Sequence, residues 1–373
     1  MYIKHIELKN FRNYGTLSCD FGDGVNVFYG DNGQGKTNIL ESVFYCSIGR
    51  SFRYSRDPDL IRYGNEDFSI GIDVSDDITE KISITYSKNG EKTARVNGLY
   101  LRKLGHLMGS LLAVIFSPED MDIVNGGPSV RRKLIDIVIS QIHPSHYFDL
   151  QQYNKITANK NNLLRDQSKT GNSLDRLLSV YNEQLSSPAA RIAIRRNKFS
   201  KELEKYASDR NMQISNGEKI SFKYISNYFS WQDNGGTEDE SEVKEAFFNL
   251  LESKLRKEKE RYHSLYGPQY DDIGIELNGT DIRRFGSQGQ KRTCVLAIKL
   301  AEVMLLRRAT GREPVLLLDD VFSELDEKRC EMLLESIGGC QTFITTANIQ
   351  ELPSSVREKS KIFFIRNGLA ELI

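Results

Sequence analysis

A glycine-rich stretch near the N-terminus constrains the fold more than any other feature of the chain. It reads Gly30-Asp31-Asn32-Gly33-Gln34-Gly35-Lys36-Thr37 and fits the pattern G-x-x-x-x-G-K-[ST]. The apolar residues 25–29 before it predict a short strand, and residues 37–44 after it predict a helix. A loop of this pattern between a strand and a helix is typical of phosphate binding, whereas an ordinary glycine turn requires neither neighbour.

The residue types in this loop suit a nucleoside di- or triphosphate. Glycines permit left-handed backbone angles, so that successive N–H groups can point inward at an anion. The N-terminus of the following helix adds partial positive charge. Lys36 is expected to reach the β- and γ-phosphates, and the Thr37 hydroxyl is expected to ligate Mg²⁺.

Size and charge set looser limits. The chain has 373 residues, enough for two core-forming units or for one domain with a large insertion. Its 51 basic and 51 acidic residues balance, so contact with nucleic acid requires a local basic patch. No apolar run reaches membrane-spanning length and the first residues lack a signal-peptide pattern, which predicts a cytoplasmic protein without a membrane partner.

The N-terminal stretch, residues 1–127, is rich in predicted strands. Residues 68–74 and 81–86 alternate apolar with polar side chains, and Asn-Gly pairs follow at turn positions. The pattern predicts an antiparallel sheet beside the phosphate loop. Residues 111–116 form an uninterrupted apolar run, as expected of a strand that is covered on both faces.

The middle stretch, residues 128–270, changes to a helical composition. Its long polar segments at 191–210 and 242–262 do not sustain a clean heptad, so a compact helical lobe is expected rather than a long coiled coil. Residues 220–224 predict a strand inside this lobe. Residues 231–242 predict an acidic, glycine-bearing loop that is mobile.

The C-terminal stretch, residues 271–373, carries a second set of chemical groups. Residues 315–318 predict a buried parallel strand that ends in Asp319 and Asp320. Ligands of open α/β sheets bind at the carboxyl ends of the strands. Asp319 is therefore expected to hold Mg²⁺ through water, and Asp320 is expected to orient or deprotonate the attacking water. The alternative is that one carboxylate only caps the next turn.

A serine motif lies upstream of that strand. Ser287-Gln288-Gly289-Gln290 opens a predicted helix at 291–308, and taken alone Ser287 is equally well explained as a helix N-cap. The other motifs in the chain change the interpretation of Ser287. A phosphate loop, a Ser-Gln-Gly-Gln helix start, an apolar strand with Asp-Asp and then Ser323-Glu324-Leu325-Asp326 form the ordered motif set of ABC-type ATPases.

Within that class the sequence resembles the RecF family, ABC-type ATPases related to SMC and Rad50 heads. The resemblance spans essentially the whole chain and is carried by short motifs: Asn10-Phe11-Arg12-Asn13-Tyr14, Gly30 through Asn38, Gly49-Arg50-Ser51, Phe116-Ser117-Pro118-Glu119-Asp120, Arg131-Arg132, Gly267-Pro268, Asp271-Asp272, Gly286-Ser287-Gln288-Gly289-Gln290 and Leu318-Asp319-Asp320-Val321-Phe322-Ser323-Glu324-Leu325-Asp326.

The resemblance implies an α/β ATPase head, with one nucleotide-binding lobe built from both chain ends and an inserted helical lobe. It implies ATP and Mg²⁺ as ligands, with Asp320, Lys36 and Ser287 as catalytic groups. The implied nucleotide contacts are Arg12, Gly30, Asp31, Asn32, Gly33, Gln34, Gly35, Lys36, Thr37 and Asn38, and Thr37 with Asp319 is the implied metal site. Arg12 is equally well explained as a surface arginine on a strand edge.

The resemblance also implies how the protein works. Ser287 to Gln290 would act in trans on the γ-phosphate held by a second copy, with Ser323 and Asp326 in the adjoining D-loop, so ATP would join two subunits head to tail. Because Asp320 is shorter than the glutamate of fast ABC ATPases, we expect slow hydrolysis that releases the dimer.

Several positions depart from the family pattern. Phe52 replaces a common histidine, and Gln269-Tyr270 replaces His-Arg after Gly-Pro. The strand end Thr345-Thr346-Ala347-Asn348 offers no γ-phosphate-sensing histidine. Glu119 or Asp120 stands where a glutamine that makes the usual Mg²⁺-sensing contact is typical.

The family further implies binding of duplex or gapped DNA near double-strand to single-strand junctions, and recombinational repair with RecR, RecO and finally RecA. Such contacts would go mainly to the backbone and weaken with salt. The candidate contacts are Arg131, Arg132, Lys133, Arg191, Arg195, Arg196, Lys198 and Lys201, although charged residues on helices usually form solvated faces.

Two other functions fit part of the pattern. A nucleotide-binding subunit of a membrane transporter would have Ser-Gly-Gly-Gln and a shorter insertion. A small-molecule kinase would use the phosphate loop but leave the Ser287 and Ser323-to-Asp326 segments unexplained.

Overall fold

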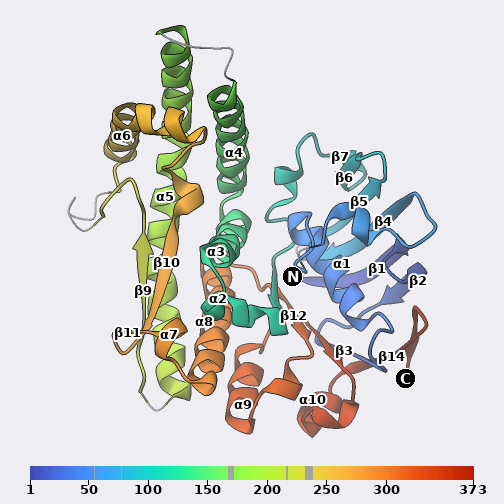
Figure 1. Ribbon diagram of the computed structural model, residues 1–373. Helices are drawn as coiled ribbons and strands as arrows, with labels where there is room; N and C mark the ends of the chain where they lie inside the picture. The colour runs from blue at the N-terminus through green and yellow to red at the C-terminus, as the bar shows by residue number, and fades with distance from the viewer. Residues whose placement is uncertain (54, 77, 167–171, 216, 232–237) are drawn as a thin grey trace. The chain divides into compact units, whose positions relative to one another are not determined.

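The computed structural model describes residues 1–373 except 54, 77, 167–171, 216 and 232–237 (Figure 1). The chain forms two compact units. Unit 1 comprises residues 1–121, 209–217 and 292–373, and unit 2 comprises residues 122–208 and 218–291. Both chain ends therefore build one unit, and residues 271–291, which composition grouped with the C-terminal stretch, lie in unit 2.

Unit 1 contains an antiparallel sheet with the strand order β2-β1-β4-β5-β6-β7. The predicted segments 68–74 and 81–86 are β4 and β5, which pair along their length. The strands are β1 (Tyr2–Phe11), β2 (Tyr14–Asp20), β4 (Asp67–Ser75), β5 (Thr79–Ser87), β6 (Lys92–Val96) and β7 (Leu99–Tyr100).

The second sheet of unit 1 carries the phosphate loop. Its order is β15-β14-β3-β13-β12-β8, and all neighbours are parallel except β14 and β15. Strands β8, β12 and β13 are buried throughout, as the apolar runs at 111–116 and 315–318 predict for the first two. The strands are β3 (Val25–Tyr29), β8 (Ala113–Phe116), β12 (Val315–Asp319), β13 (Thr342–Thr346), β14 (Lys361–Arg366) and β15 (Leu369–Leu372).

Helix α1 (Lys36–Ile48) lies in the core of unit 1, in contact with strands of both sheets. Ile39, Leu40 and Val43 on it are fully buried. The other helices that lie wholly in this unit are α9 (Glu327–Ser336) and α10 (Ser354–Arg357), with short 3₁₀ turns at Asp57–Leu60, Leu104–Leu107, Pro118–Met121, Phe322–Glu324 and Ile349–Glu351. Burial of α1 on nearly every side fixes the direction in which the phosphate loop opens.

Unit 2 is mainly helical, and its three-stranded sheet has the order β11-β10-β9. The predicted strand at 220–224 is β9, which pairs with β10. Phe247, Ala193 and Tyr153 belong to its apolar core. The elements are α2 (Asp122–Asn125), α3 (Pro128–Ile142), α4 (Pro144–Arg165), α6 (Glu240–Arg261), α7 (Ile282–Phe285), β9 (Ile220–Ile225), β10 (Asp272–Leu277), β11 (Thr280–Asp281) and the 3₁₀ turn Pro268–Tyr270.

Two helices belong to both units. Helix α8 (Gln288–Thr310) starts in unit 2 and continues in unit 1. Helix α5 (Asn172–Ile214) has 43 residues and is far longer than the predicted segment 191–210, with Pro188 inside it. A proline usually marks a helix boundary, which explains why the sequence indicates only the part that follows it.

The predicted loop at 231–242 falls mostly on residues 232–237, which lie outside the described residues. Of its flanks, Trp231 is buried in the core of unit 2, and Asp239 caps the start of α6. Across the part of the chain that is described, no helix combines the length and the apolar character needed to cross a membrane.

Candidate functional site

The glycine-rich loop between β3 and α1 has the backbone geometry that its sequence predicts. Gly30, Gly33 and Gly35 have φ values of 143°, 82° and 116°, in the left-handed region that glycine favours. Lys36 Nζ donates to the carbonyl oxygens of Gly30 at 2.5 Å and Asp31 at 2.9 Å, so its side chain closes the loop. Burial lowers the pKa of Lys36, because the charged ammonium loses hydration there.

Residues outside the motif hold this loop in shape. Asn13, in the turn between β1 and β2, donates from Nδ2 to Gln34 O at 2.6 Å and accepts from Asn38 Nδ2 at 2.8 Å. The Tyr14 hydroxyl donates to Gly35 O at 3.0 Å. From the turn between β14 and β15, Asn367 N donates to Gln34 Oε1 at 2.7 Å. The motif alone gave no signal for these supports, although Asn13 and Tyr14 lie in a segment that carries the family resemblance.

Two predicted metal ligands meet at the carboxyl edge of the parallel sheet. Thr37 Oγ1 donates to Asp319 Oδ1 at 2.7 Å, although the two residues are 282 positions apart. The Thr345 hydroxyl on β13, the strand between β3 and β12, donates to the same oxygen at 2.7 Å. Burial raises the pKa of Asp319, and the two donated hydrogen bonds oppose that shift.

These residues fit Mg²⁺ chemically. A hydroxyl and a carboxylate are hard oxygen ligands, and Mg²⁺ is commonly bound by one or two protein groups together with phosphate oxygens and water. Within the described residues no group of three or more His, Cys, Asp and Glu side chains is placed to hold a metal. An ion beside Thr37 and Asp319 would therefore need ligands from a bound phosphate and from water.

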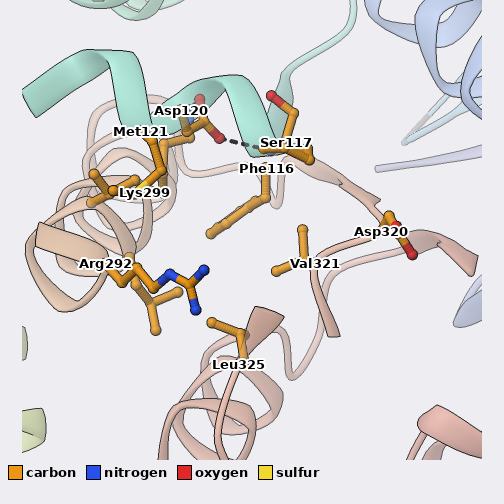
Figure 2. Close-up of a pocket in the computed structure, with 12 residues that line it drawn as sticks. Phe116, Ser117, Asp120, Met121, Arg292, Lys299, Asp320, Val321 and Leu325 are labelled. Carbon is orange, nitrogen blue, oxygen red and sulfur yellow. Dashed lines mark hydrogen bonds and ion pairs between the residues drawn. The ribbon is translucent and has the colours of Figure 1, made fainter. Parts of the chain in front are cut away.

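Asp320 follows Asp319 in a strained backbone conformation. Its φ is 53°, uncommon for a residue other than glycine. The conformation is held by two hydrogen bonds, because Asp320 N donates to Thr345 Oγ1 at 3.0 Å and Ser323 Oγ donates to Asp320 O at 2.8 Å. Figure 2 shows Asp320 at the rim of a cavity, with its carboxylate directed away from that cavity. Asp320 as a residue is exposed.

Arg12 is engaged by the protein itself. Its guanidinium donates to both carboxylate oxygens of Glu41 on α1, at 2.8 and 2.7 Å, and to the Ser55 hydroxyl at 2.6 Å. The Glu41 side chain is completely buried. A contact between Arg12 and nucleotide stays a prediction, and Glu41 is a site neighbour that the sequence analysis missed.

The serine motif forms a capping box at the start of α8. Gln290 N donates to Ser287 Oγ at 3.2 Å, and Ser287 N donates to Gln290 Oε1 at 2.8 Å. Lys291 Nζ donates to Arg283 O at 2.9 Å, which ties the short helix α7 to α8. Ser287, Gln288 and Gly289 remain exposed. Ser287 therefore caps its helix, and its action on the nucleotide of a second copy stays a prediction.

The two D-loop residues have local roles. Ser323 supports Asp320, as described above, and Asp326 caps α9 by accepting from Arg329 N at 3.0 Å. Arg329 also donates to the Thr293 hydroxyl of α8, at 2.7 Å from Nη2. At the position that lacks a histidine, Asn348 Oδ1 accepts from Gln350 N at 3.0 Å and caps a 3₁₀ turn.

Two predicted DNA contacts must be corrected. Arg131 is buried and donates to both oxygens of Asp272 at 2.8 and 2.9 Å. Arg196 is buried between Asp136, which it contacts at 2.9 and 2.7 Å, and Asp271 at 3.2 Å. Guanidinium groups that are buried and already paired with carboxylates are not available to phosphate.

The other candidates are more accessible. Arg132 donates to Asp271 O at 2.5 Å, and Arg195 pairs with Asp149 at 2.5 Å, yet both side chains reach the surface, as does Lys133. Their contact with DNA stays a prediction. Gln269, at the position of a family histidine, accepts a hydrogen bond from the Tyr153 hydroxyl at 2.5 Å. The residue therefore has a structural partner inside unit 2.

Comparison with known proteins agrees with this geometry. The family model of the RecF/RecN/SMC N terminal domain matches residues 2–371. The DNA replication and repair protein RecF of Clostridium novyi (strain NT) is 41% identical over 370 residues, which covers 99% of each chain. The protein of the same name from Ruminiclostridium cellulolyticum is 40% identical over 371 residues, 99% of this chain and 98% of the relative.

Solved structures of RecF proteins are also similar to this chain. A structure described as the recombination mediator protein RecF-ATP in the RecFOR pathway is 38% identical, with a TM-score of 0.92, and is matched over 97% of its chain and 100% of this one. The RecF-ATPrS structure has a TM-score of 0.91 at the same identity, with 98% of its chain and 100% of this one covered. An Smc head bound to a domain of ScpA, 16% identical with a TM-score of 0.56, shares the fold.

Proposed function

Because the chain belongs to the RecF family within the RecF/RecN/SMC N-terminal domain group, we propose that it is an ATP-hydrolysing, DNA-binding repair protein whose dimerisation is gated by ATP. ATP binds at the loop between β3 and α1, two subunits join head to tail on duplex DNA near the junctions of a gap, and slow hydrolysis releases them. The RecFOR description of the related structures supports RecO and RecR as partners. Loading of RecA is the outcome that we propose.

One observation carries the nucleotide part of this proposal. Thr37, at the start of α1, and Asp319, at the end of β12, meet at 2.7 Å beside a loop whose glycines have the φ values of an anion-binding nest. Thr37 and Asp319 would hold Mg²⁺, which when bound neutralises the charge that develops on the phosphates. Lys36 exchanges its contacts with loop carbonyls for contacts with phosphate oxygens.

Asp320 is the proposed positioning group for the attacking water. Its carboxylate accepts a proton or a hydrogen bond from that water. The Asp320 backbone is held by the bond that its N–H donates to Thr345 and by the bond that its carbonyl accepts from Ser323. The side chain is one methylene shorter than glutamate, so it holds the water less closely. We therefore expect slow turnover that times the life of the dimer.

Ser287 completes the site of the other subunit. Ser287 and the first residues of α8 are exposed at a capped helix start, and helix N-termini bind anions. In a two-fold dimer each triphosphate then contacts the loop of one copy and Ser287 of the other. ADP lacks the γ-phosphate, so its dimer is weaker.

Sedimentation velocity tests this function. The wild-type protein is run with ATP, with ADP and without nucleotide, each with and without a gapped duplex. We expect a dimer with ATP only, and co-sedimentation of the dimer with DNA that weakens as salt rises. Asp320→Asn is expected to bind ATP and to stay dimeric for longer than the wild type. A protein that remains monomeric at all concentrations with a non-hydrolysable ATP analogue would refute the proposal.

A further inference from the structure

Three charged side chains lie together inside unit 1, where Lys299 and Glu302 are buried and the Asp120 side chain is 15% exposed. Lys299 on α8 lies 2.7 Å from Glu302 Oε2, one turn further along the helix, and 3.9 Å from Asp120 Oδ1. The side chains of Lys299 and Glu302 are each 3% exposed. Asp120 Oδ2 accepts from Ser117 N at 2.8 Å, so the cluster also holds the turn that follows β8. We call Asp120, Lys299 and Glu302 the buried charge cluster.

The buried charge cluster joins two places where the chain changes unit. The chain enters unit 2 after Met121, directly beyond Asp120. It returns to unit 1 at Arg292 on α8, about two helical turns before Lys299. The contact between Asp120 and Lys299 therefore ties an outgoing segment to the returning helix, whose first turn carries Ser287.

The same cluster borders the catalytic edge of the parallel sheet. Lys299 Nζ lies 5.9 Å from the ring centroid of Phe116, the last residue of β8, and Phe116 pairs with Leu318, the residue before Asp319. Asp120 and Lys299 line a cavity of about 60 Å³ together with Asp320 and Leu325 (Figure 2). Asp320 and Lys299 therefore border the same cavity.

Stability does not explain this cluster. Burying charges costs hydration energy, and replacing buried ion pairs by uncharged side chains is often neutral or stabilising. Glu302 Oε1 is buried with no hydrogen-bond partner among the described residues, and burial raises the pKa of Glu302 to about 7. The Lys299 ammonium has a near carboxylate, Glu302, and a more distant one, Asp120, and it can shift between them. The adjoining cavity leaves room for the neighbouring side chains to move.

We propose that Asp120, Lys299 and Glu302 are positioning residues that couple the nucleotide at the Asp319 and Asp320 edge to the orientation of α8, and hence of Ser287 toward a second copy. This inference rests on the proposed function. The proposed ligands of ATP and Mg²⁺ are other residues of unit 1, namely Lys36, Thr37 and Asp319. Substituting the residues of the buried charge cluster leaves nucleotide binding by the monomer intact, but the bound nucleotide then no longer promotes dimerisation.

A pair of matched double variants tests the coupling. Lys299→Met with Glu302→Gln removes the cluster pair, and Lys160→Met with Glu258→Gln removes a second buried ion pair, at 2.6 Å in unit 2. For each protein we measure thermal unfolding, binding of a fluorescent ATP analogue to the monomer, ATP-driven dimerisation and kcat. The cluster variant should lose about tenfold or more in dimerisation and in kcat, with analogue affinity within about twofold of the wild type. The control should match the wild type in analogue affinity, in dimerisation and in kcat.

Asp120→Asn provides a second test that can be used if the double variant folds poorly. This substitution preserves the shape of the side chain and removes one charge. It should show the same loss of dimerisation with unchanged analogue binding. Wild-type dimerisation in either folded cluster variant would overturn the coupling. If instead the wild type itself fails to dimerise with ATP, the proposed function fails, and the two outcomes are thereby separated.

Discussion

At the scale of single residues, Thr345 joins the two carboxylates of the site. Its hydroxyl donates to Asp319 Oδ1 at 2.7 Å and accepts from Asp320 N at 3.0 Å. One side chain therefore orients the proposed metal ligand and holds the left-handed backbone of the proposed catalytic residue. Such supporting contacts commonly matter as much for activity as the groups they orient.

Thr345→Val removes this hydroxyl and keeps a β-branched side chain in the strand. We expect kcat for ATP to fall by about 10- to 100-fold, because Asp319 and Asp320 lose their common support. Steady-state hydrolysis and binding of a fluorescent analogue measure the effect. Thr342→Val is the control, since Thr342 is buried on the same strand and its hydroxyl donates to Cys340 O at 3.2 Å. Equal activity of the two variants would remove Thr345 from the site.

At the scale of elements, the phosphate loop depends on turns from both sheets. The turn between β1 and β2 supplies Asn13 and Tyr14, and the turn between β14 and β15 supplies Asn367. These contacts explain why the loop needs glycine at two positions. A Cβ on Gly35 would collide with the Asn13 amide, and a Cβ on Gly30 would collide with Ile365 O.

Asn13→Ala tests this support without changing the loop sequence. The variant leaves Gln34 O and Asn38 Nδ2 without their Asn13 partner, so the loop is less preorganised. We expect ATP to bind about tenfold more weakly, equivalent to ~1.4 kcal/mol. Isothermal titration with ATP gives the affinity, and Asn65→Ala in an exposed turn of unit 1 is the control. Unchanged affinity in Asn13→Ala would show that the loop keeps its shape unaided.

At the scale of the whole molecule, the proposed site is shared between two subunits. Lys36 and Asp319 lie in unit 1, whereas Ser287 lies in unit 2. A two-fold dimer would then contain two equivalent sites, each with Lys36 from one chain and Ser287 from the other. This arrangement predicts complementation between defective chains.

Lys36→Ala and Ser287→Arg should each hydrolyse ATP poorly alone. When they are mixed, a heterodimer contains one site with both defects and one intact site, so activity should recover to about a quarter of the wild-type value with random pairing. The hydrolysis rate of the mixture measures the recovery. Mixing Lys36→Ala with Asp319→Asn is the control, since both changes affect the same half-site and no intact site can form. Recovery in that control, or none in the test mixture, would contradict a site shared between subunits.

The sequence by itself determined the local chemistry. The phosphate loop, the strand that ends in Asp319 and the helix that starts at Ser287 could be predicted because each depends on neighbouring residues: glycine backbone freedom, uninterrupted apolar runs and capping side chains. The ordered motifs also identified the family, which the full-length relatives confirm. Helix α5 shows the limit of local signals, because Pro188 reads as a boundary and the packed helix continues through it.

Only the tertiary structure decided which distant groups meet. No local pattern pairs Thr345 with Asp319, Asn13 with Gln34, or Asp120 with Lys299, since these contacts follow from strand order and from the return of α8 to unit 1. Burial likewise separated Arg131 and Arg196, paired with carboxylates, from arginines that reach the surface. The physical reason is that the sequence specifies the type and charge of each residue, whereas the solvation of a side chain and its contact partners are set only when the chain packs.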